Sequence, residues 1–426
     1  MNSLKPMLLT SLKSYNRSQF IKDVTAGIIV AIIALPLSIA LALASGVGPE
    51  AGIFTAIVAG FVISALGGSS VQIAGPTAAF ATIVAGIVAK DGMDGLVIAT
   101  ILAGIFLVLM GLCHFGSLIK FIPFTITTGF TSGIAVTIVI GQLKDFFGLT
   151  YPDGVKPIET TEKFRAVVEN FSTINIDALI VGSVSLAVLI IAPYIFKRIP
   201  GSLIAVIIGI LMVQFLPLKV STIGNLYTIS NSLPSFHLPA VSLEVVQNAL
   251  PNAFTIAVLA AIESLLSCVV ADGMLNGKHR SDMELVAQGA GNIASALFGG
   301  IPATGAIART AANIKNGGRT PIAGIVHSIT LVIVLVVLMP YAGMIPMPTI
   351  AAILFIVAYN MCQWHTFVKL VKTAPKSDII VLFCFIYPDS TLRPGRSDRD
   401  WYGSCLPALY QAYERRDTRQ QLDLCG

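Results

Sequence analysis

The sequence predicts an all-α polytopic membrane protein with two inverted seven-span repeats and two half-helices, the third and tenth spans, that meet at the membrane midplane. The first observation is composition: 55% of the 426 residues are apolar, 12% are charged, and the mean hydropathy is +0.83. Soluble domains carry about 25% charged residues. The second is a succession of apolar stretches of membrane-spanning character. The third is a pair of short, proline-led apolar segments at matching places in the two halves, a pattern typical of transporter binding sites.

Twelve apolar stretches follow one another along the chain. In order, they lie at 24–44, 50–67, 73–89, 94–115, 121–141, 176–196, 201–216, 250–271, 284–298, 302–314, 321–341 and 349–368. The third and tenth are expected to be half-helices. A helix from Pro76 to about Ala89 covers only roughly 20 Å, less than the hydrocarbon core of about 30 Å.

The two short stretches share more than length. Pro76 and Pro302 lie 226 residues apart, and similar lead-ins precede them, Ser-Ala-Leu-Gly-Gly ending at Gly68 and Ser-Ala-Leu-Phe-Gly-Gly ending at Gly300. Ordinary proline kinks in two full spans are the alternative interpretation. The matched offset, lead-in and shortness together favour two interrupted helices.

Basic residues favour a cytoplasmic N-terminus in the cell membrane. In that orientation fourteen lysines and arginines fall in inner loops and six in outer loops, in line with the positive-inside rule. The loops fall on these two sides only if both short segments are counted as membrane crossings. Seven stretches precede residue 217, so the second repeat starts an odd number of crossings later and is inverted.

These assignments divide the chain into five parts. They are a cytoplasmic segment at 1–23, a first repeat at 24–216, an extracellular linker at 217–249, an incomplete second repeat at 250–383 and an aberrant polar tail at 384–426. About 12 of 14 spans are therefore expected. The tail holds six of the twelve arginines but none of the fifteen lysines. We interpret it as sequence from a shifted reading frame, with a disordered cytoplasmic tail as the alternative.

The half-helices predict an anion site built from backbone. A helix N-terminus presents unpaired N–H groups and a partial positive charge of about half a unit, so two of them bind an anion without a lysine. Proline suits the first turn, and threonine hydroxyls can donate to an oxyanion or accept a small cation. The predicted binding residues surround the two prolines: Gly75, Pro76, Thr77, Ala78, Ala303, Thr304 and Gly305.

Two charged residues lie inside predicted spans, Glu263 in 250–271 and Arg309 in 302–314. Such residues cost about 2.5–3.5 kcal/mol on insertion scales, and they commonly serve a function. We expect Arg309 to add positive potential behind the anion site. Glu263, with Thr304, is expected to bind the coupling ion, H⁺ or Na⁺. A structural Glu263–Arg309 ion pair is the alternative.

Other classes of function find little support in the sequence. It contains no GxSxG, HExxH or Walker motif, so an enzyme is not expected. The six cysteines show neither CxxC nor zinc spacing, so apart from a Na⁺ ion at Glu263 and Thr304 we predict neither a metal nor a cofactor. The net charge of +5 is spread over loops, which argues against a nucleic-acid partner. The expected partners are a small inorganic anion and the lipid bilayer.

Several motifs, in order along about residues 15–383, resemble the sulfate permease (SulP) family of inorganic anion transporters. They are Ala34-Leu-Pro-Leu-Ser-Ile-Ala40, Val71-Gln-Ile-Ala-Gly-Pro-Thr77, Ala261-Ile-Glu-Ser-Leu-Leu266, Val270-Ala-Asp-Gly273, Asn276-Gly-Lys-His-Arg280, Gly299-Gly-Ile-Pro-Ala-Thr-Gly-Ala-Ile-Ala-Arg-Thr-Ala-Ala-Asn313 and Asn316-Gly-Gly-Arg-Thr320. The resemblance implies a core domain that moves against a gate domain. It also implies that six residues line or support the substrate site: Thr77, Ala78, Glu263, Ala303, Thr304 and Arg309.

By the same resemblance, the expected function is secondary active transport of sulfate or bicarbonate by H⁺ or Na⁺ symport. A C4-dicarboxylate symporter, an uncoupled anion channel and an inactive truncated copy are the alternatives. Family members often form dimers, largely through a C-terminal cytoplasmic STAS domain. Because this chain lacks that domain and the last two spans, we expect a homodimer to be weakened.

Overall fold

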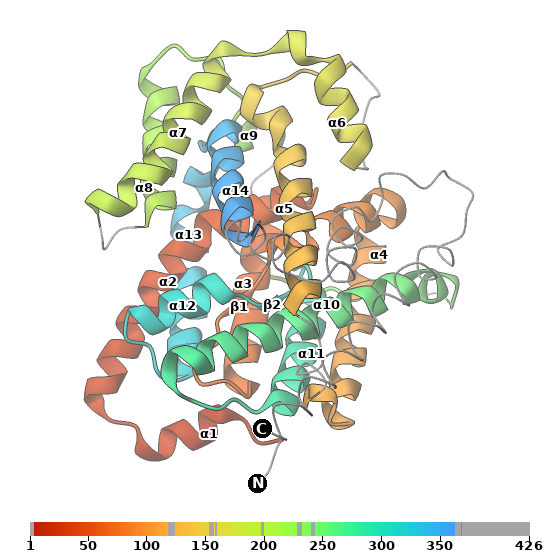
Figure 1. The fold of residues 1–426 in the computed structure, drawn as a ribbon, viewed down its shortest axis with the longest axis vertical. Helices are drawn as coiled ribbons and strands as arrows, with labels where there is room; N and C mark the ends of the chain where they lie inside the picture. Colours follow the sequence, from red (N-terminus) through yellow and green to blue (C-terminus); the bar gives the residue numbers. More distant parts are fainter. Residues whose placement is uncertain are drawn as a thin grey trace.

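The computed structural model describes residues 4–117, 124–152, 157, 160–196, 200–227, 232–239, 243–362 and 368. Within them the chain forms a helical bundle, with one two-stranded ribbon at its centre (Figure 1). The predictions for residues 363–367 and 369–426, including the aberrant tail, lie outside the described residues.

The long helices follow the predicted spans closely. Those of the first repeat are α2 (Arg17–Ala44), α3 (Pro49–Leu66), α4 (Ala78–Leu112), α5 (Phe124–Phe147), α7 (Ile176–Ile195) and α8 (Gly201–Phe215). Those of the second are α10 (Leu243–Leu275), α11 (Ser281–Leu297), α12 (Ile307–Lys315), α13 (Ile322–Ala342) and α14 (Met347–Cys362). Six of the described helices are long and apolar enough to cross a membrane: α2, α3, α4, α7, α10 and α13.

The shorter elements lie in the connections. They are α1 (Met7–Ser11), the 3₁₀ turn Leu12–Ser14, α6 (Thr160–Glu169), the 3₁₀ turn Phe171–Thr173 and α9 (Ile223–Leu226). The predicted linker 217–249 is not loop throughout, because α9 lies within it and α10 already begins at Leu243. The sequence reading placed the start of this span at residue 250, where the apolar character begins.

Helix α4 combines the predicted third and fourth spans. Its backbone leaves helical geometry at Gly92, where φ is 72° and ψ is −171°. A residue with a side chain rarely adopts this conformation, so glycine is the residue that permits the break. The half-helix that begins at Ala78 therefore ends at a glycine, and the full fourth span follows from there.

The two repeats interlock, because helices of each repeat pack against helices of the other. The first helix of each repeat packs on the other repeat: α2 packs on α13, and α10 packs on α4, which combines the third and fourth spans. The fifth spans, α5 and α14, pack on each other. This reciprocity is what two inverted repeats related by an axis in the membrane plane require.

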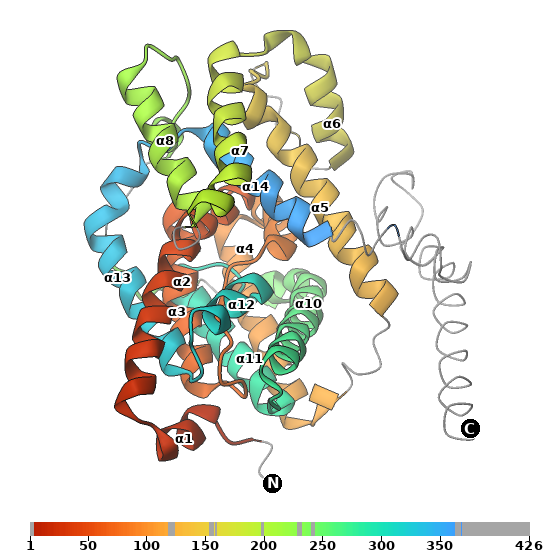
Figure 2. The ribbon, with the colours of Figure 1, turned by 60° about the vertical axis from the view of Figure 1, so that its left-hand side comes forward.

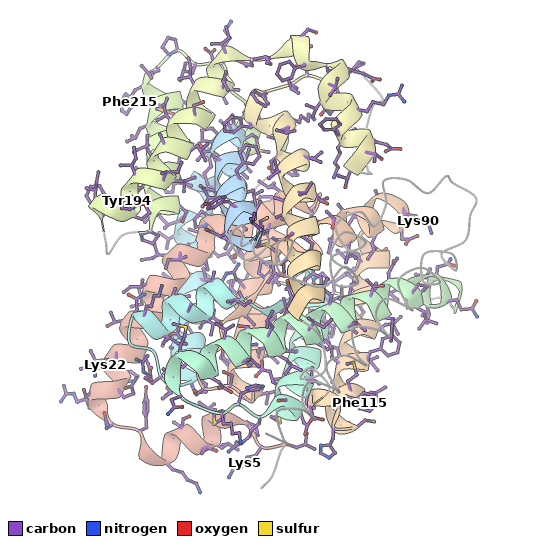
Figure 3. All side chains as sticks on the ribbon, viewed as in Figure 1. Lys5, Lys22, Lys90, Phe115, Tyr194 and Phe215 are labelled. Carbon is purple, nitrogen blue, oxygen red and sulfur yellow. The ribbon has the colours of Figure 1, made fainter. Side chains whose placement is uncertain are left out.

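The helices form two groups (Figures 1 and 2). Helices α5, α7, α8 and α14 pack together in the upper part of Figure 1. Helices α2, α3, α4, α10, α11, α12 and α13 surround the ribbon below them. The outer side chains of the α7–α8 pair are apolar: Tyr194 is 82% exposed, Phe215 is 78% exposed, and Figure 3 shows both pointing away from the bundle. A lipid-facing surface has this character.

The N-terminal segment is tied to the bundle through Asp23. This residue was assigned to the polar segment 1–23, but it lies inside α2 and is fully buried. Its carboxylate accepts hydrogen bonds from the Tyr15 hydroxyl, the Thr320 hydroxyl and the backbone N–H of Arg319. Burial, together with the Asp23 carboxylate, raises the pKa of Tyr15 to about 12. Asp23 therefore joins the start of α2 to the connection between α12 and α13.

Candidate functional site

The site is organised by two short strands. β1 (Ala74–Gly75) leads into α4, and β2 (Thr304–Gly305) leads into α12. They pair antiparallel, with Ala74 opposite Gly305 and Gly75 opposite Thr304. Beyond them, the N–H of Ala306 donates to the carbonyl of Ile73 at 2.9 Å. The two helices leave this ribbon in opposite directions, so their N-termini lie on either side of it in the middle of the bundle (Figure 1).

The expectation that proline occupies the first helical turn is wrong for both half-helices. Helix α4 begins at Ala78, two residues after Pro76, and α12 begins at Ile307, five residues after Pro302. Since Gly75 pairs with Thr304, the two prolines are not equivalent in the fold. Both precede their helices in non-helical backbone, as the missing N–H and the restricted residue before proline favour.

Both helix N-termini lack a side-chain cap. The N-cap residues are Thr77 in α4 and Ala306 in α12, and neither accepts a capping hydrogen bond through its side chain. Serine, threonine, aspartate or asparagine usually supplies this acceptor. Thr77 is partly exposed, and beside Ala306 the side chain of Ile307 is 37% exposed. The first N–H groups of each helix are therefore available to a bound anion.

The hydroxyl of Thr77 bonds to Glu263 instead of capping α4. It donates to Oε2 of Glu263 at 2.9 Å. Glu263 lies on α10 and is partly exposed. Among the described residues, the hydrogen bond of Glu263 thus goes to Thr77 rather than to Thr304. The carboxyl group of Glu263 therefore lies next to the uncapped end of α4.

Thr304 holds the second strand in place. It is fully buried, its hydroxyl shares a hydrogen bond with Ser264 Oγ, and it donates to the carbonyl of Ala260 at 3.2 Å. The N–H of Gly305 also donates to Ser264 Oγ, at 3.1 Å. Adjacent residues of α10 therefore hold both halves of the site, Glu263 the start of α4 and Ser264 the strand before α12.

Arg309 lies behind the ribbon. Its side chain is 1% exposed, and Nη2 donates to the carbonyl of Pro76 at 3.0 Å and to the hydroxyl of Ser38 at 3.5 Å. Nε and Nη1 have no hydrogen-bond partner among the described residues. A side chain at Gly75 would collide with Nη1. The guanidinium thus contacts the backbone that precedes α4, and no Glu263–Arg309 ion pair exists within the described residues.

A stripe of polar side chains on α11 supports both extended segments. Glu284, Gln288, Asn292 and Ser295 are all fully buried and lie along one face of the helix. The carboxylate of Glu284 accepts hydrogen bonds from the N–H of Gly68 at 2.9 Å, from the N–H of Ser69 at 3.1 Å and from Nε2 of Gln72 at 2.9 Å. It therefore holds the segment that leads into β1.

The far end of the stripe holds the segment that leads into β2. Asn292 donates to the carbonyl of Ala303 at 2.9 Å and accepts from its N–H at 2.8 Å. Ser295 donates to the carbonyl of Ile301 at 2.9 Å, and the N–H of Ile301 donates to Thr55 of α3 at 2.7 Å. Extended backbone inside a membrane protein needs such partners, because no water is present to replace them.

The structure thus brings most predicted residues together around the ribbon, but it changes their roles. Ala303, Thr304 and Gly305 are buried, and the exposed start of α12 is Ala306 to Ala308. Ser264 and the α11 stripe were missed as parts of the site. Their signal was available, since polar residues four apart inside an apolar span mark one helix face. No group of three or more His, Cys, Asp or Glu residues that could hold a metal occurs among the described residues.

Comparisons with known proteins agree with this architecture. The sulfate permease family profile matches residues 20–385. The putative sulfate transporter YvdB of Bacillus subtilis is 43% identical over 357 residues, which cover 82% of this chain and 66% of that protein. The bicarbonate transporter BicA of a Picosynechococcus strain is 32% identical over 370 residues, which cover 84% of this chain and 65% of that protein. The chain thus spans just under two thirds of each of these relatives.

A solved structure matches the fold as well. The transmembrane domain of a cyanobacterial bicarbonate transporter BicA superposes with a TM-score of 0.79 and is 27% identical in sequence. The superposition covers 93% of this chain and 98% of that one.

Proposed function

Because the chain belongs to the sulfate permease family, we propose that it is a secondary active transporter of a small inorganic oxyanion, sulfate or bicarbonate. The observation that carries the proposal is the pair of uncapped helix N-termini beside the ribbon. Their N–H groups and partial positive charges form a site whose chemistry suits an oxyanion. The names of the curated relatives, a putative sulfate transporter and a bicarbonate transporter, support the same class of substrate.

We infer that Glu263 couples transport to a cation. Its carboxyl group is hydrogen-bonded to Thr77, the N-cap of α4. When ionised, it places a negative charge beside the anion site and opposes substrate binding. Protonation, or a bound Na⁺, removes this repulsion. Anion and cation then bind together and are carried together, as symport requires.

Alternating access is the proposed mechanism. The ribbon, the half-helices and the α11 stripe form one hydrogen-bonded unit in the lower helix group, whereas α5, α7, α8 and α14 form the other group. Movement of the first group against the second would expose the site to each side in turn. The hydrogen bonds within the first group would stay formed while that group and the site move together.

We also propose that the end of the molecule with α1 faces the cytoplasm. Of the described lysines and arginines other than Arg309, eight lie at or near that end: Lys5, Lys13, Arg17, Lys22, Lys278, Arg280, Lys315 and Arg319. Five lie at the other end: Lys90, Lys144, Lys163, Arg165 and Lys219. Figure 3 shows Lys5 and Lys22 in the lower part of the molecule, Lys22 at its left edge. The positive-inside rule assigns the richer end to the cytoplasm.

Uptake of radiolabelled sulfate into proteoliposomes tests the proposal. Inward Na⁺ and inward H⁺ gradients are imposed separately, bicarbonate and fumarate serve as competitors, and protein-free liposomes give the background. Accumulation driven by one gradient is expected, and the stronger competitor identifies the preferred class of anion. Folded protein that shows no uptake under either gradient would contradict the proposal, and sulfate flux that ignores both gradients would indicate a channel.

A further inference from the structure

A polar cavity lies along the first half of α4, beyond the N-terminus of this helix. It has a volume of about 350 Å³ and is bounded by the end of α2, one face of α4, the end of α5 and α6. This volume falls in the range of small-molecule sites, about 300–1,000 Å³. In the orientation proposed above, the cavity is on the outer side of the membrane.

The cavity runs along α4 toward the anion site. Ala81, Ala85 and Ala89 line it, and residues four apart lie on one face of a helix. Ala81 comes one turn after Ala78, the first residue of α4. From Ala78 to Ala89 the helix rises about 16 Å. The alanine face thus extends from the uncapped N-terminus of α4 to the outer end of the cavity.

Charged and polar groups are concentrated in the walls. Lys144 of α5 and Lys163 of α6 both line the cavity, together with Thr82, Thr137 and Gln142. Asp145 lines it too, so the two ammonium groups outnumber the carboxylates by one. A cleft with an excess of one sign of charge attracts ions of the opposite sign and raises their local concentration.

Of the two cations, Lys163 gives the stronger indication of an anion site. Lys144 is exposed, with its ammonium 4.9 Å from the centre of the Tyr151 ring. Lys163 is only partly exposed, and among the residues that the structure describes its ammonium has no hydrogen-bond or ion-pair partner. Burial lowers the pKa of Lys163. A buried charge normally has a partner, and an anion in the cavity would supply one.

We propose that this cavity is an outer vestibule in which Lys144 and Lys163 bind a small inorganic oxyanion before it moves along the alanine face of α4 to the helix N-termini. The inference rests on the proposed function and orientation, and adds to them a second binding site for the same class of anion. Because α4 and α5 belong to different helix groups, the vestibule lies between the parts that move.

Transport kinetics test the role of Lys163. With sulfate outside, Lys163→Gln is expected to raise the KM about 10-fold, equivalent to about 1.4 kcal/mol, and to leave kcat unchanged. Lys163→Arg keeps the charge and is expected to restore the KM. Lys219→Gln is the matched control, since Lys219 is an exposed lysine at the same end whose side chain does not line the cavity. A KM unchanged by Lys163→Gln, or raised equally by Lys219→Gln, would overturn the proposal.

A labelling experiment separates this site from transport itself. In Lys163→Cys, sulfate at concentrations well above the raised KM of this variant is expected to slow modification by a membrane-impermeant thiol reagent applied from outside, with the parent protein as background. A cationic reagent is expected to lower the sulfate KM toward that of the parent, and an anionic reagent to raise it. If the parent does not transport sulfate, protection still reports binding in the vestibule. Absence of sulfate protection would refute the vestibule even where the parent transports.

Discussion

We propose that Arg309 acts on the anion site through the backbone that precedes α4. Its side chain is 1% exposed, and its nearest partner is the Pro76 carbonyl, two residues before α4. From there the guanidinium donates to the Pro76 carbonyl and would add positive potential near the N-terminus of α4. An intramembrane cation placed in this way costs insertion energy, and function is the usual reason for its presence.

Replacement of Arg309 should therefore weaken anion binding in proportion to the charge that is lost. Hydrogen bonds to charged groups contribute about 1.5–3 kcal/mol, so Arg309→Ala is expected to raise the KM by roughly 10- to 150-fold. Arg309→Lys keeps the charge and should raise it less. Substrate dependence of uptake measures both, with thermal unfolding as a control for folding. Equal affinity in Arg309→Ala and the parent would leave Arg309 a purely structural role.

Glu263 allows a sharper separation of binding from coupling. Glu263→Gln keeps a carbonyl oxygen that can accept the hydrogen bond from Thr77, but it cannot release a proton or balance Na⁺. We expect this variant to exchange labelled sulfate across the membrane while losing accumulation driven by a gradient. Parallel measurement of exchange and of gradient-driven uptake distinguishes the two. Full gradient-driven accumulation in Glu263→Gln would place the coupling at another residue.

Helix α11 explains how extended backbone can persist inside the bundle. Two segments lack helical hydrogen bonds, one before β1 and one before β2, and the buried stripe on α11 provides partners for both. Asn292 binds both the N–H and the carbonyl of Ala303. A buried polar group left without its partner costs about 1–3 kcal/mol.

Asn292→Leu should thus lower stability and transport together. The substitution keeps the branching at Cγ but leaves both backbone groups of Ala303 unpaired, a predicted loss of about 2–6 kcal/mol. Asn316→Leu is the matched control, because Asn316 is exposed and bonds only to the Ala312 carbonyl within the described residues. Thermal unfolding in detergent checks both variants. Similar unfolding temperatures for the two would mean that the α11 stripe does not hold the ribbon.

The sequence predicted the order and approximate bounds of these helices because apolar length is read directly from composition. The prediction was wrong where backbone hydrogen bonds determine the start of a helix or the pairing of two strands. The tenth span begins at Ile307 rather than at Pro302, because residues 301–305 gain partners from α3, α10 and α11. Matching Pro76 to Pro302 also misaligned the halves, because strand register is set by pairing and not by sequence likeness.

The exchange of helices between the repeats makes the bundle one interlocked body. Since α2 packs on α13 and α10 packs on α4, neither repeat forms its half of the site alone. By the positive-inside rule, we propose that the charges at the two ends determine how this body lies in the membrane. At the end that holds α1, the end of α4 meets the start of α11, where His114 contacts Asp282 at 2.8 Å. At the same end, Arg280 donates to the Lys5 carbonyl at 2.7 Å and joins the start of α11 to the N-terminal segment.

Thiol labelling of whole cells checks this orientation. Cys113 is exposed and ends α4 beside His114 at the basic end, whereas Lys219 lies at the opposite end, where its N–H donates to Asp177. An impermeant maleimide should label Lys219→Cys above the parent in intact cells. The difference in labelling between the parent and Cys113→Ser measures labelling at Cys113. This difference should appear only in permeabilised cells. Labelling of Cys113 in intact cells would invert the topology, and the lysine-lined vestibule would then receive anions from the cytoplasm.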